Sequence, residues 1–322
     1  MIAGSLPWAL SALGLILLFL AGDSLVKGAV NLSLRLGVSA LIVSLTIVSF
    51  GTSAPELFVS IKAVLENTPG IALGNVVGSN TANILLVLGV PALVATIQIS
   101  NCDAKQSYNY MIAVSLLFIA LAFRGVFDWK SALILLIILV FMLTISIRKA
   151  LVVRTFHNPS SKIENEADNH KIFFPVWKIT LLLIFGMTGL PLGASLLVDN
   201  ATIIARVYGV SDTVIGLTFV AVGTSLPELA TTAVAALRRQ AEMALGNVIG
   251  SNMFNILAVL GITSLVSPIP VAAEILHFDL WIMLGASVLL IPFVYMGRDI
   301  TRIWGIILTG LYLLYLACLM AK

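Results

Sequence analysis

The sequence is poor in charge. Asp, Glu, Lys and Arg together make up 10% of its 322 residues, whereas 60% of the residues are hydrophobic. A soluble globular domain has about 25% charged residues, which cover its water-facing surface. This chain lacks such a surface, so an ordinary water-soluble protein is excluded and a lipid environment is favoured. The formal net charge of +3 is too small to indicate a nucleic-acid partner.

Cysteine, histidine and enzyme motifs are scarce or absent. Cys102 and Cys318 lie far apart and lack metal-ligand spacing, so we expect unpaired thiols. The three histidines lie in expected loops or short connections, where a solvated side chain is the simplest interpretation. The sequence contains no G-x-S-x-G, HExxH or paired-aspartate motif and no G-x-x-x-x-G-K-[ST] nucleotide loop. We therefore expect neither an enzyme nor an ATP-driven pump, and no cofactor.

Long apolar runs dominate the chain instead. A membrane-spanning helix needs about 20 mostly apolar residues, and runs of that length recur from Trp8 to Met320. The first run follows no basic segment, so we expect a permanent span rather than a removable signal. We predict an all-α membrane protein of ten transmembrane helices, at residues 8–33, 38–66, 70–97, 106–124, 129–148, 174–206, 210–238, 242–267, 278–297 and 301–320.

The two halves of the chain repeat each other. Residues 51–94 and 223–266 align without a gap at a constant offset of 172, with 24 of 44 positions identical. The identities include Pro, Glu, Asn, Ser and Gly, so shared apolar composition does not explain them. We predict a first five-helix repeat at 1–148, a linker at 149–173 and a second five-helix repeat at 174–322. Five spans per half would insert the halves in opposite senses, which makes the repeats inverted.

The orientation follows from the positions of the basic residues. In the predicted topology, twelve Lys or Arg residues lie on the side of the linker and five on the other side. Cytoplasmic loops carry the excess of Lys and Arg, so the linker is predicted to be cytoplasmic and both termini outside. We expect a multi-pass protein of the cell (inner) membrane, with the lipid bilayer as its surroundings and no obligate protein partner.

Two glutamates lie inside apolar spans at matching positions of the repeat, Glu56 and Glu228. An ionised side chain at the bilayer centre costs about 2.5–3.5 kcal/mol on insertion scales. No Lys or Arg is repeated nearby, and one divalent cation would neutralise both carboxylates. The alternative is a pair of protonated, structural glutamates. Each Glu follows a proline, Pro55 or Pro227, that cannot donate an amide hydrogen, which predicts a broken helix with carbonyl groups free for a hard cation.

A second repeated motif supplies amide and hydroxyl groups. Asn75, Ser79 and Asn83 are spaced by four and share one helix face, and the same spacing recurs in Asn247, Ser251 and Asn255. For Asn80 and Asn252, packing and function are equally good interpretations. We predict that Asn83 and Asn255 face the glutamates as ligands. Every candidate ligand is an oxygen, which favours Ca²⁺ or Na⁺ over zinc or copper.

The two motifs, G-T-S-x-P-E followed by G-N-V-[VI]-G-S-N, resemble the paired repeats of the calcium/cation antiporter family, over essentially the whole chain. The resemblance implies a Ca²⁺ site at Glu56 and Glu228 with the backbone carbonyls of Thr52 and Thr224. It implies flanking Na⁺ sites with Ser53, Ser225, Ser79, Ser251 and Asn83. It also implies that the first and sixth helices slide past this core, which exposes the ions to each side in turn.

The resemblance favours sodium/calcium exchange, with Ca²⁺ and Na⁺ as substrates. Some members have Asp at the position of Asn255, including the potassium-dependent branch, which argues against potassium transport here. The proton-coupled branch has a G-N-[AV]-x-E motif in place of G-T-S-x-P-E. Two alternatives stay open: H⁺/Ca²⁺ antiport through the same glutamates, and a passive cation channel. Asp23, Lys27 and Asp199 are predicted to be gate or surface residues, with Asp23 and Lys27 able to pair.

Overall fold

The protein is nearly all helical in the computed structural model, which describes residues 5–156, 174–209 and 221–320. The elements of the first half are α1 (Ser5–Leu36), α2 (Ala40–Val43), η1 (Ser44–Val48), α3 (Ser49–Thr52), α4 (Ala54–Leu65), α5 (Pro69–Leu85), α6 (Gly89–Val94), η2 (Ile99–Asn101), α7 (Lys105–Ala122), β1 (Val126–Phe127) and α8 (Trp129–Phe156). Those of the second half are α10 (Val176–Val207), α12 (Ala221–Thr224), α13 (Leu226–Leu237), α14 (Ala241–Phe254), η4 (Asn255–Leu260), α15 (Gly261–Val266), β2 (Ile269–Pro270), η5 (Ile275–Asp279), α16 (Leu280–Val288), α17 (Ile291–Met296) and α18 (Arg302–Met320).

Ten spans were predicted, but fewer than ten of the described helices are long and apolar enough to cross a membrane. Within the described residues, seven helices are long and apolar enough to cross a membrane, and the bent pair Ala40–Thr52 and Ala54–Leu65 makes an eighth. The other two predicted spans correspond to α7, which falls outside this set, and to the segment of α12 and α13. In the described part of that segment, Leu226–Leu237 is an apolar helix of 12 residues, which is too short to count as a complete span. Residues 210–220, where that span was predicted to begin, lie outside the described residues.

Helix α8 continues beyond the apolar run that was predicted as the fifth span, residues 129–148. The linker was expected to begin at residue 149, but α8 continues as a helix to Phe156. The segment after residue 148 begins K-A-L-V-V-R, which contains no Pro or Gly to end a helix, so the backbone continues its hydrogen bonding beyond the apolar run. The rest of the predicted linker, residues 157–173, lies outside the described residues.

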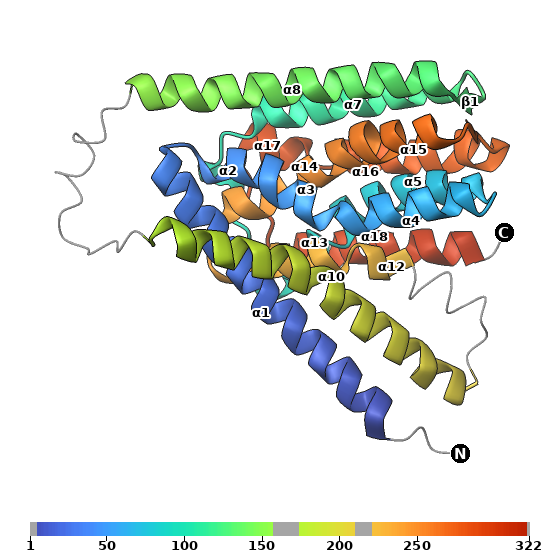
Figure 1. The fold of residues 1–322 in the computed structure, drawn as a ribbon, viewed down its shortest axis with the longest axis horizontal. Helices are drawn as coiled ribbons and strands as arrows, with labels where there is room; N and C mark the ends of the chain where they lie inside the picture. Colours follow the sequence, from blue (N-terminus) through green and yellow to red (C-terminus); the bar gives the residue numbers. More distant parts are fainter. Residues whose placement is uncertain (1–4, 157–173, 210–220, 321–322) are drawn as a thin grey trace.

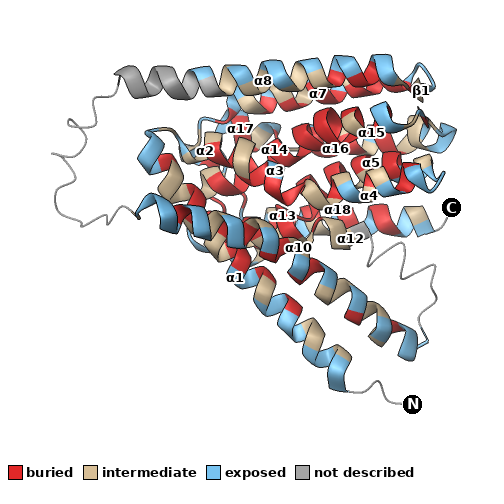
Figure 2. Ribbon diagram, in the orientation of Figure 1, coloured by how far each residue is buried: buried red, intermediate tan, exposed pale blue. Residues whose placement is uncertain are grey.

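The helices are arranged as a buried centre with lipid-facing helices around it. Figure 2 shows the centre, around α5 and α14, coloured mostly buried, whereas α1, α8 and α10 carry long exposed faces. The apolar stretches of Pro69–Val94 and Ala241–Val266 are 83% and 89% buried, against 17% for Trp129–Ser146. The exposed faces carry large apolar side chains, such as Leu15 of α1 and Phe141 of α8. Because such faces are stable only against hydrocarbon, the arrangement is that of a membrane protein.

Two short backbone pairings connect the halves at opposite ends of the molecule. β1 pairs antiparallel with β2, with Phe127 opposite Ile269, and lies at the right-hand end of Figure 1. An isolated bridge joins Ile97 to Ile300, which lies two residues before the start of α18. The C-terminal end of α18 points to the right in Figure 1, so its start, and the bridge beside it, lie farther to the left. Ile97 and Ile269 occupy equivalent positions of the two halves, because they are separated by the repeat offset of 172. Each of them pairs with a residue of the other half.

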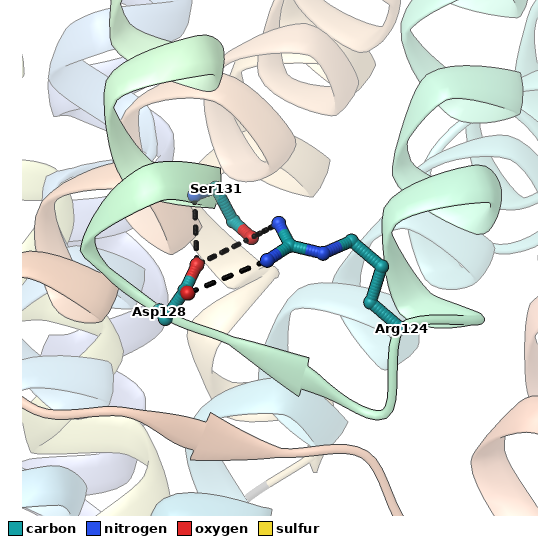
Figure 3. Close-up of polar contacts among 3 residues, drawn as sticks. All are labelled: Arg124, Asp128 and Ser131. Carbon is teal, nitrogen blue, oxygen red and sulfur yellow. Dashed lines mark hydrogen bonds and ion pairs between the residues drawn. The ribbon is translucent and has the colours of Figure 1, made fainter.

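A polar turn fixes the start of α8 beside β1. Figure 3 shows Arg124, at the end of α7, reaching across to Asp128 and Ser131. The Asp128 Oδ1 atom accepts hydrogen bonds from the Ser131 backbone N–H and hydroxyl, each at 3.0 Å, and Arg124 Nη2 lies 3.4 Å from Asp128 Oδ2. The backbone hydrogen bond from Ser131 and the nearby Arg124 charge lower the pKa of Asp128. The carboxylate therefore stays ionised as the N-cap of α8.

Helices α1 and α10 cross in close contact through matched glycines, side by side in Figure 1. A Cβ atom on Gly14 would lie 2.7 Å from the Leu197 backbone nitrogen, and one on Gly186 would lie 2.6 Å from Leu25 Cβ. Gly14 and Gly186 are separated by 172 residues, as are Leu25 and Leu197, so the two contacts are equivalent. Small residues at such crossings let two helix backbones approach in lipid.

We predict that Gly186→Ala loosens the contact between α1 and α10. The new methyl group would overlap with Leu25, and overpacking of this kind costs about 1–3 kcal/mol. The thermal unfolding midpoint in detergent should fall. Gly310→Ala on α18 is the matched control, because a Cβ atom there meets nothing within 4 Å. Equal midpoints for the two variants would contradict the close packing of α1 and α10.

Candidate ion-binding site

Both halves break a helix at the same serine. Between α3 and α4, Ser53 has φ −87° and ψ 5°, and between α12 and α13, Ser225 has φ −86° and ψ 2°. The segments before and after Ser53 are bent by 40°. The break falls just before the proline in each half, as predicted, because Pro55 and Pro227 have no amide hydrogen to continue the ladder. Each new helix therefore begins at membrane depth, with its N-terminus inside the protein.

The two glutamates lie in the first turns of these new helices. Glu56 in α4 and Glu228 in α13 are both 0% exposed. The partial positive charge of a helix N-terminus favours an anion at this position. No Lys, Arg or His among the described residues forms an ion pair with either carboxylate. Glu228 Oε1 instead accepts hydrogen bonds from the hydroxyls of Ser53 at 3.1 Å and Ser251 at 3.5 Å.

Matched asparagines hold the backbone next to each glutamate. Asn75 of α5 donates to the Glu56 carbonyl at 3.2 Å and to the Ser60 hydroxyl at 3.1 Å. Asn247 of α14 donates to the Glu228 carbonyl at 3.3 Å and to the Thr232 hydroxyl at 3.1 Å. Each amide fixes the helix that begins at the break against the helix that follows it, so the position of each carboxylate is set by its own half.

A second set of asparagines joins the two halves. The Asn83 amide donates to the Asn252 side-chain oxygen at 3.0 Å, and the Asn252 amide donates to the Asn80 carbonyl at 3.4 Å. The amides of Asn80 and Asn252 also contact the sulfur atoms of Met283 at 3.8 Å and Met111 at 3.7 Å. For Asn80 and Asn252, these contacts support the packing interpretation. They cross-link α5 and α14 at the centre of the molecule.

The predicted ligands account for most of the buried polar atoms without a hydrogen-bond partner. A buried polar group left unpaired costs about 1–3 kcal/mol, so a group of such atoms requires a partner. Eight of the twelve such atoms among the described residues belong to predicted ligands: Glu56 Oε1 and Oε2, Asn83 Oδ1, Thr224 Oγ1, Ser225 Oγ, Glu228 Oε2, and Asn255 Oδ1 and Nδ2. Seven are oxygens, the donor that Na⁺ and Ca²⁺ prefer.

The hydrogen bonds bring some predicted ligands together directly. Thr52, Ser53, Ser251 and Glu228 form one connected group, in which the Thr52 hydroxyl lies 3.4 Å from Ser251 Oγ and 3.2 Å from the side-chain oxygen of Asn247. For Glu56, Ser225 and Asn255, the structure shows burial and unpaired side-chain atoms. Asn255 begins η4, which packs against α4, the helix that carries Glu56. No hydrogen bond joins Asn255 to Glu56 within the described residues.

A cavity reaches the cluster from one side. It has a volume of about 320 Å³, and both Ser79 of α5 and Thr224 of α12 line it. In the first half, the Thr52 hydroxyl bonds to Asn247 of α14, whereas the Thr224 hydroxyl has no hydrogen-bond partner among the described residues.

The charged residues of α1 and α10 lie away from this cluster. Asp23 pairs with Lys27 at 2.7 Å, as predicted, and also with Arg238 at the end of α13. Asp199 is exposed on α10. The Asp23–Arg238 pair ties α1 to the broken helix of the second half.

Sequence reasoning did not identify the hydroxyl partners of the two clamping asparagines. Ser60 and Thr232 are separated by 172 residues and both carry a hydroxyl, so the repeat contained a usable signal. Ser49 bonds to the Asn247 carbonyl of the other half at 3.1 Å. The repeat gives no signal for this contact, because the matching residue is Ala221.

A polytopic helical membrane protein with broken spans and buried, unpaired oxygens at its centre has the features of an ion transporter. A profile of the sodium/calcium exchanger protein family matches residues 6–148 and 178–321. The chain belongs to this family: it is a membrane transporter, a cation/Ca²⁺ antiporter, and not an enzyme.

Named relatives and a solved structure agree with this assignment. The putative antiporter CaxA of Alkalimonas amylolytica is 37% identical over 309 residues, covering 94% of this chain and 95% of the relative. The sodium/calcium exchanger MaX1 of Methanosarcina acetivorans is 34% identical over 337 residues, covering 95% and 96%. A structure of the sodium-calcium exchanger NCX_Mj, soaked with zero Na⁺ and Ca²⁺, superposes with a TM-score of 0.82 at 32% identity over 99% of this chain and 100% of that chain.

Proposed function

We propose that the protein exchanges Ca²⁺ for Na⁺ across the cell membrane by alternating access. The observation that supports this most directly is the group of buried, unpaired oxygens around two carboxylates that have no basic partner. A cation of charge +2 balances Glu56 and Glu228, and Na⁺ ions balance the same charge when they replace it. The name of the relative MaX1, a sodium/calcium exchanger, supports sodium as the counter-ion.

In this proposal, Ca²⁺ binds between Glu56 and Glu228, with the backbone carbonyls of Thr52 and Thr224 completing its shell. The flanking Na⁺ ions use Ser53, Ser225, Ser79, Ser251 and Asn83, and Asn255 contributes a neutral oxygen. The connected group of Ser53, Ser251 and Glu228 supports a site that both halves build. The cavity beside Ser79 and Thr224 supports access from one side.

The proposed architecture is ten transmembrane helices in two inverted five-helix repeats, residues 1–148 and 174–322. The equivalent glycine contacts and the two end pairings support a two-fold relation between the halves. In this architecture, α7 and the α12–α13 segment are the remaining two of the ten spans. Both pack against α14 in the buried centre, so they face less lipid and need a shorter apolar surface. In Figure 1, the start of α1 and the end of α18 lie toward the right, and the end of α8 and the start of α10 toward the left. This placement supports termini on the side opposite the linker.

The orientation predicts that residue 160 is cytoplasmic. In intact cells, an impermeant thiol reagent should fail to label Ser160→Cys in a Cys102→Ser, Cys318→Ser background, because the excess of basic residues on that side predicts that it is cytoplasmic. The same reagent should label the variant in inverted vesicles, which controls for reactivity. Labelling in intact cells would reverse the assigned orientation.

A sodium gradient should drive calcium uptake. Proteoliposomes preloaded with Na⁺ should accumulate ⁴⁵Ca²⁺, whereas vesicles preloaded with K⁺, or given only a proton gradient, should not. Uptake driven by protons alone would establish the H⁺/Ca²⁺ alternative. Calcium entry in the absence of any counter-ion gradient would indicate a passive channel and contradict exchange.

Each glutamate should be essential for this uptake. Glu56→Gln and Glu228→Gln each remove one of the two charges that balance Ca²⁺, and we expect at least about a hundredfold loss of exchange, the effect of roughly 3 kcal/mol. Glu66→Gln is the matched control, because Glu66 is exposed at the end of α4. Elution as a single species in detergent would show that the variants fold. Near-normal uptake by either site variant would contradict the two-glutamate site.

A further inference from the structure

Three side-chain amides meet where α5 packs against α14, and their hydrogen bonds have a direction. Asn80 and Asn83 belong to α5 and Asn252 to α14, and none of them is more than 1% exposed. A side-chain amide has an acceptor oxygen at one end and a donor NH₂ group at the other. Because the three groups are buried, their protein neighbours decide which end of each amide points where.

Asn252 has acceptors on one side of its amide. Its Nδ2 atom lies 3.4 Å from the Asn80 backbone oxygen and 3.7 Å from Met111 Sδ of α7. A carbonyl oxygen and a thioether sulfur can accept a hydrogen bond but cannot donate one, so the NH₂ group of Asn252 has to face them. The side-chain oxygen of Asn252 is thereby turned the other way, toward Asn83.

The orientation of Asn252 in turn fixes that of Asn83. Asn83 Nδ2 lies 3.0 Å from Asn252 Oδ1, and only the NH₂ end of Asn83 can donate to that oxygen. Asn83 Oδ1 is left buried and without a hydrogen-bond partner among the described residues. Met111, Asn252 and Asn83 thus form an orienting chain that leaves an oxygen, and not an NH₂ group, free at a predicted ion ligand.

The methionine of this chain recurs in the second half, although its helix has diverged. Residues 105–122 match residues 277–294 at four of 18 positions, and Met111 and Met283 are one of these four pairs. Both methionines are 0% exposed, and Met283 Sδ accepts from Asn80 Nδ2 at 3.8 Å. The Asn80 side-chain oxygen has no hydrogen-bond partner among the described residues, so the Met283 contact is not passed on to a predicted ligand.

We propose that Asn252 and Met111 are positioning residues for Na⁺, because they hold Asn83 with its side-chain oxygen free to bind the cation. The inference rests on the proposed function, in which Asn83 is a ligand of a flanking Na⁺ ion. A hard cation binds oxygen, whereas the hydrogens of an NH₂ group carry partial positive charge and would repel it. Since Ca²⁺ is assigned to other ligands, the orienting chain acts on Na⁺ binding and leaves Ca²⁺ binding largely unchanged.

Separate Na⁺ and Ca²⁺ affinities test the proposal. Asn252→Leu removes the acceptor that orients Asn83 and should raise the half-saturating Na⁺ concentration about tenfold, the lower end of the effect of losing a group that orients a metal ligand. The half-saturating Ca²⁺ concentration should stay near the wild-type value. Both affinities can be measured in exchange, and also without transport, from the rise of the thermal unfolding midpoint with each ion at constant ionic strength.

Two methionine variants form a matched pair. Met111→Leu nearly keeps the side-chain volume and removes the sulfur. It should raise the half-saturating Na⁺ concentration in the same direction as Asn252→Leu but by less, because the Asn80 carbonyl still holds the Asn252 amide. Met283→Leu removes an equally buried sulfur from Asn80 and should leave Na⁺ affinity unchanged. If Asn252→Leu does not fold, this pair decides the question.

A double variant shows whether Asn252 acts through Asn83. Asn83→Ala removes the proposed ligand and should itself weaken Na⁺ binding. Adding Asn252→Leu to it should cause no further loss, because the group that Asn252 orients is already absent. Independent, additive losses would contradict the orienting chain.

Three further results would overturn the inference. They are an unchanged Na⁺ affinity in Asn252→Leu, an equal loss of Na⁺ and Ca²⁺ affinity in that variant, and equal effects of Met111→Leu and Met283→Leu. The second and third would mean that the variants loosen the packing of the centre and do not reorient Asn83. A wild-type protein that Na⁺ does not stabilise would instead refute the sodium sites of the proposed function, and the orienting chain with them.

Discussion

The rest of the structure depends on one constraint: two carboxylates are buried at membrane depth inside the protein, without a basic partner among the described residues. Each costs about 2.5–3.5 kcal/mol to place at the bilayer centre on insertion scales, and Glu56 and Glu228 are both fully buried. The broken helices place an N-terminus behind each acid, and Asn75 and Asn247 hold the adjacent carbonyls. These features lower the cost without cancelling the charge, which is why we propose a cation as the partner of the two carboxylates.

The features that occur in both repeats could be predicted from the sequence. The helix breaks before Pro55 and Pro227 and the burial of both glutamates were predicted from the two motifs and are confirmed. The end of α8 was predicted too early, because an apolar run marks the membrane boundary and does not mark the end of helical hydrogen bonding. The contact between Asn83 and Asn252 was not predictable, because it depends on how α5 and α14 meet. The ligand roles remain predictions.

The halves share a sequence motif but not an identical environment. Thr52 bonds across to Asn247, whereas Thr224 faces the cavity beside α5 without a partner. Asp279 of the second half has Ser107 as its counterpart. Ser49 likewise has Ala221 as its counterpart, so the residues around the repeated motifs differ between the halves.

The glycine contact between α1 and α10 has a consequence for biosynthesis. The surface of α1 that carries Gly14 is completed only when α10 has been made, and Leu36 and Val176 are 140 residues apart (176 − 36). At about 5–20 residues per second, α1 waits on the order of ten seconds for its partner. Over the same interval, Asn83 and Glu56 sit in the translocon or the lipid before α14 exists to cover them. The contacts between the halves, such as that of Gly14 with Leu197, therefore form only after the first half has been inserted.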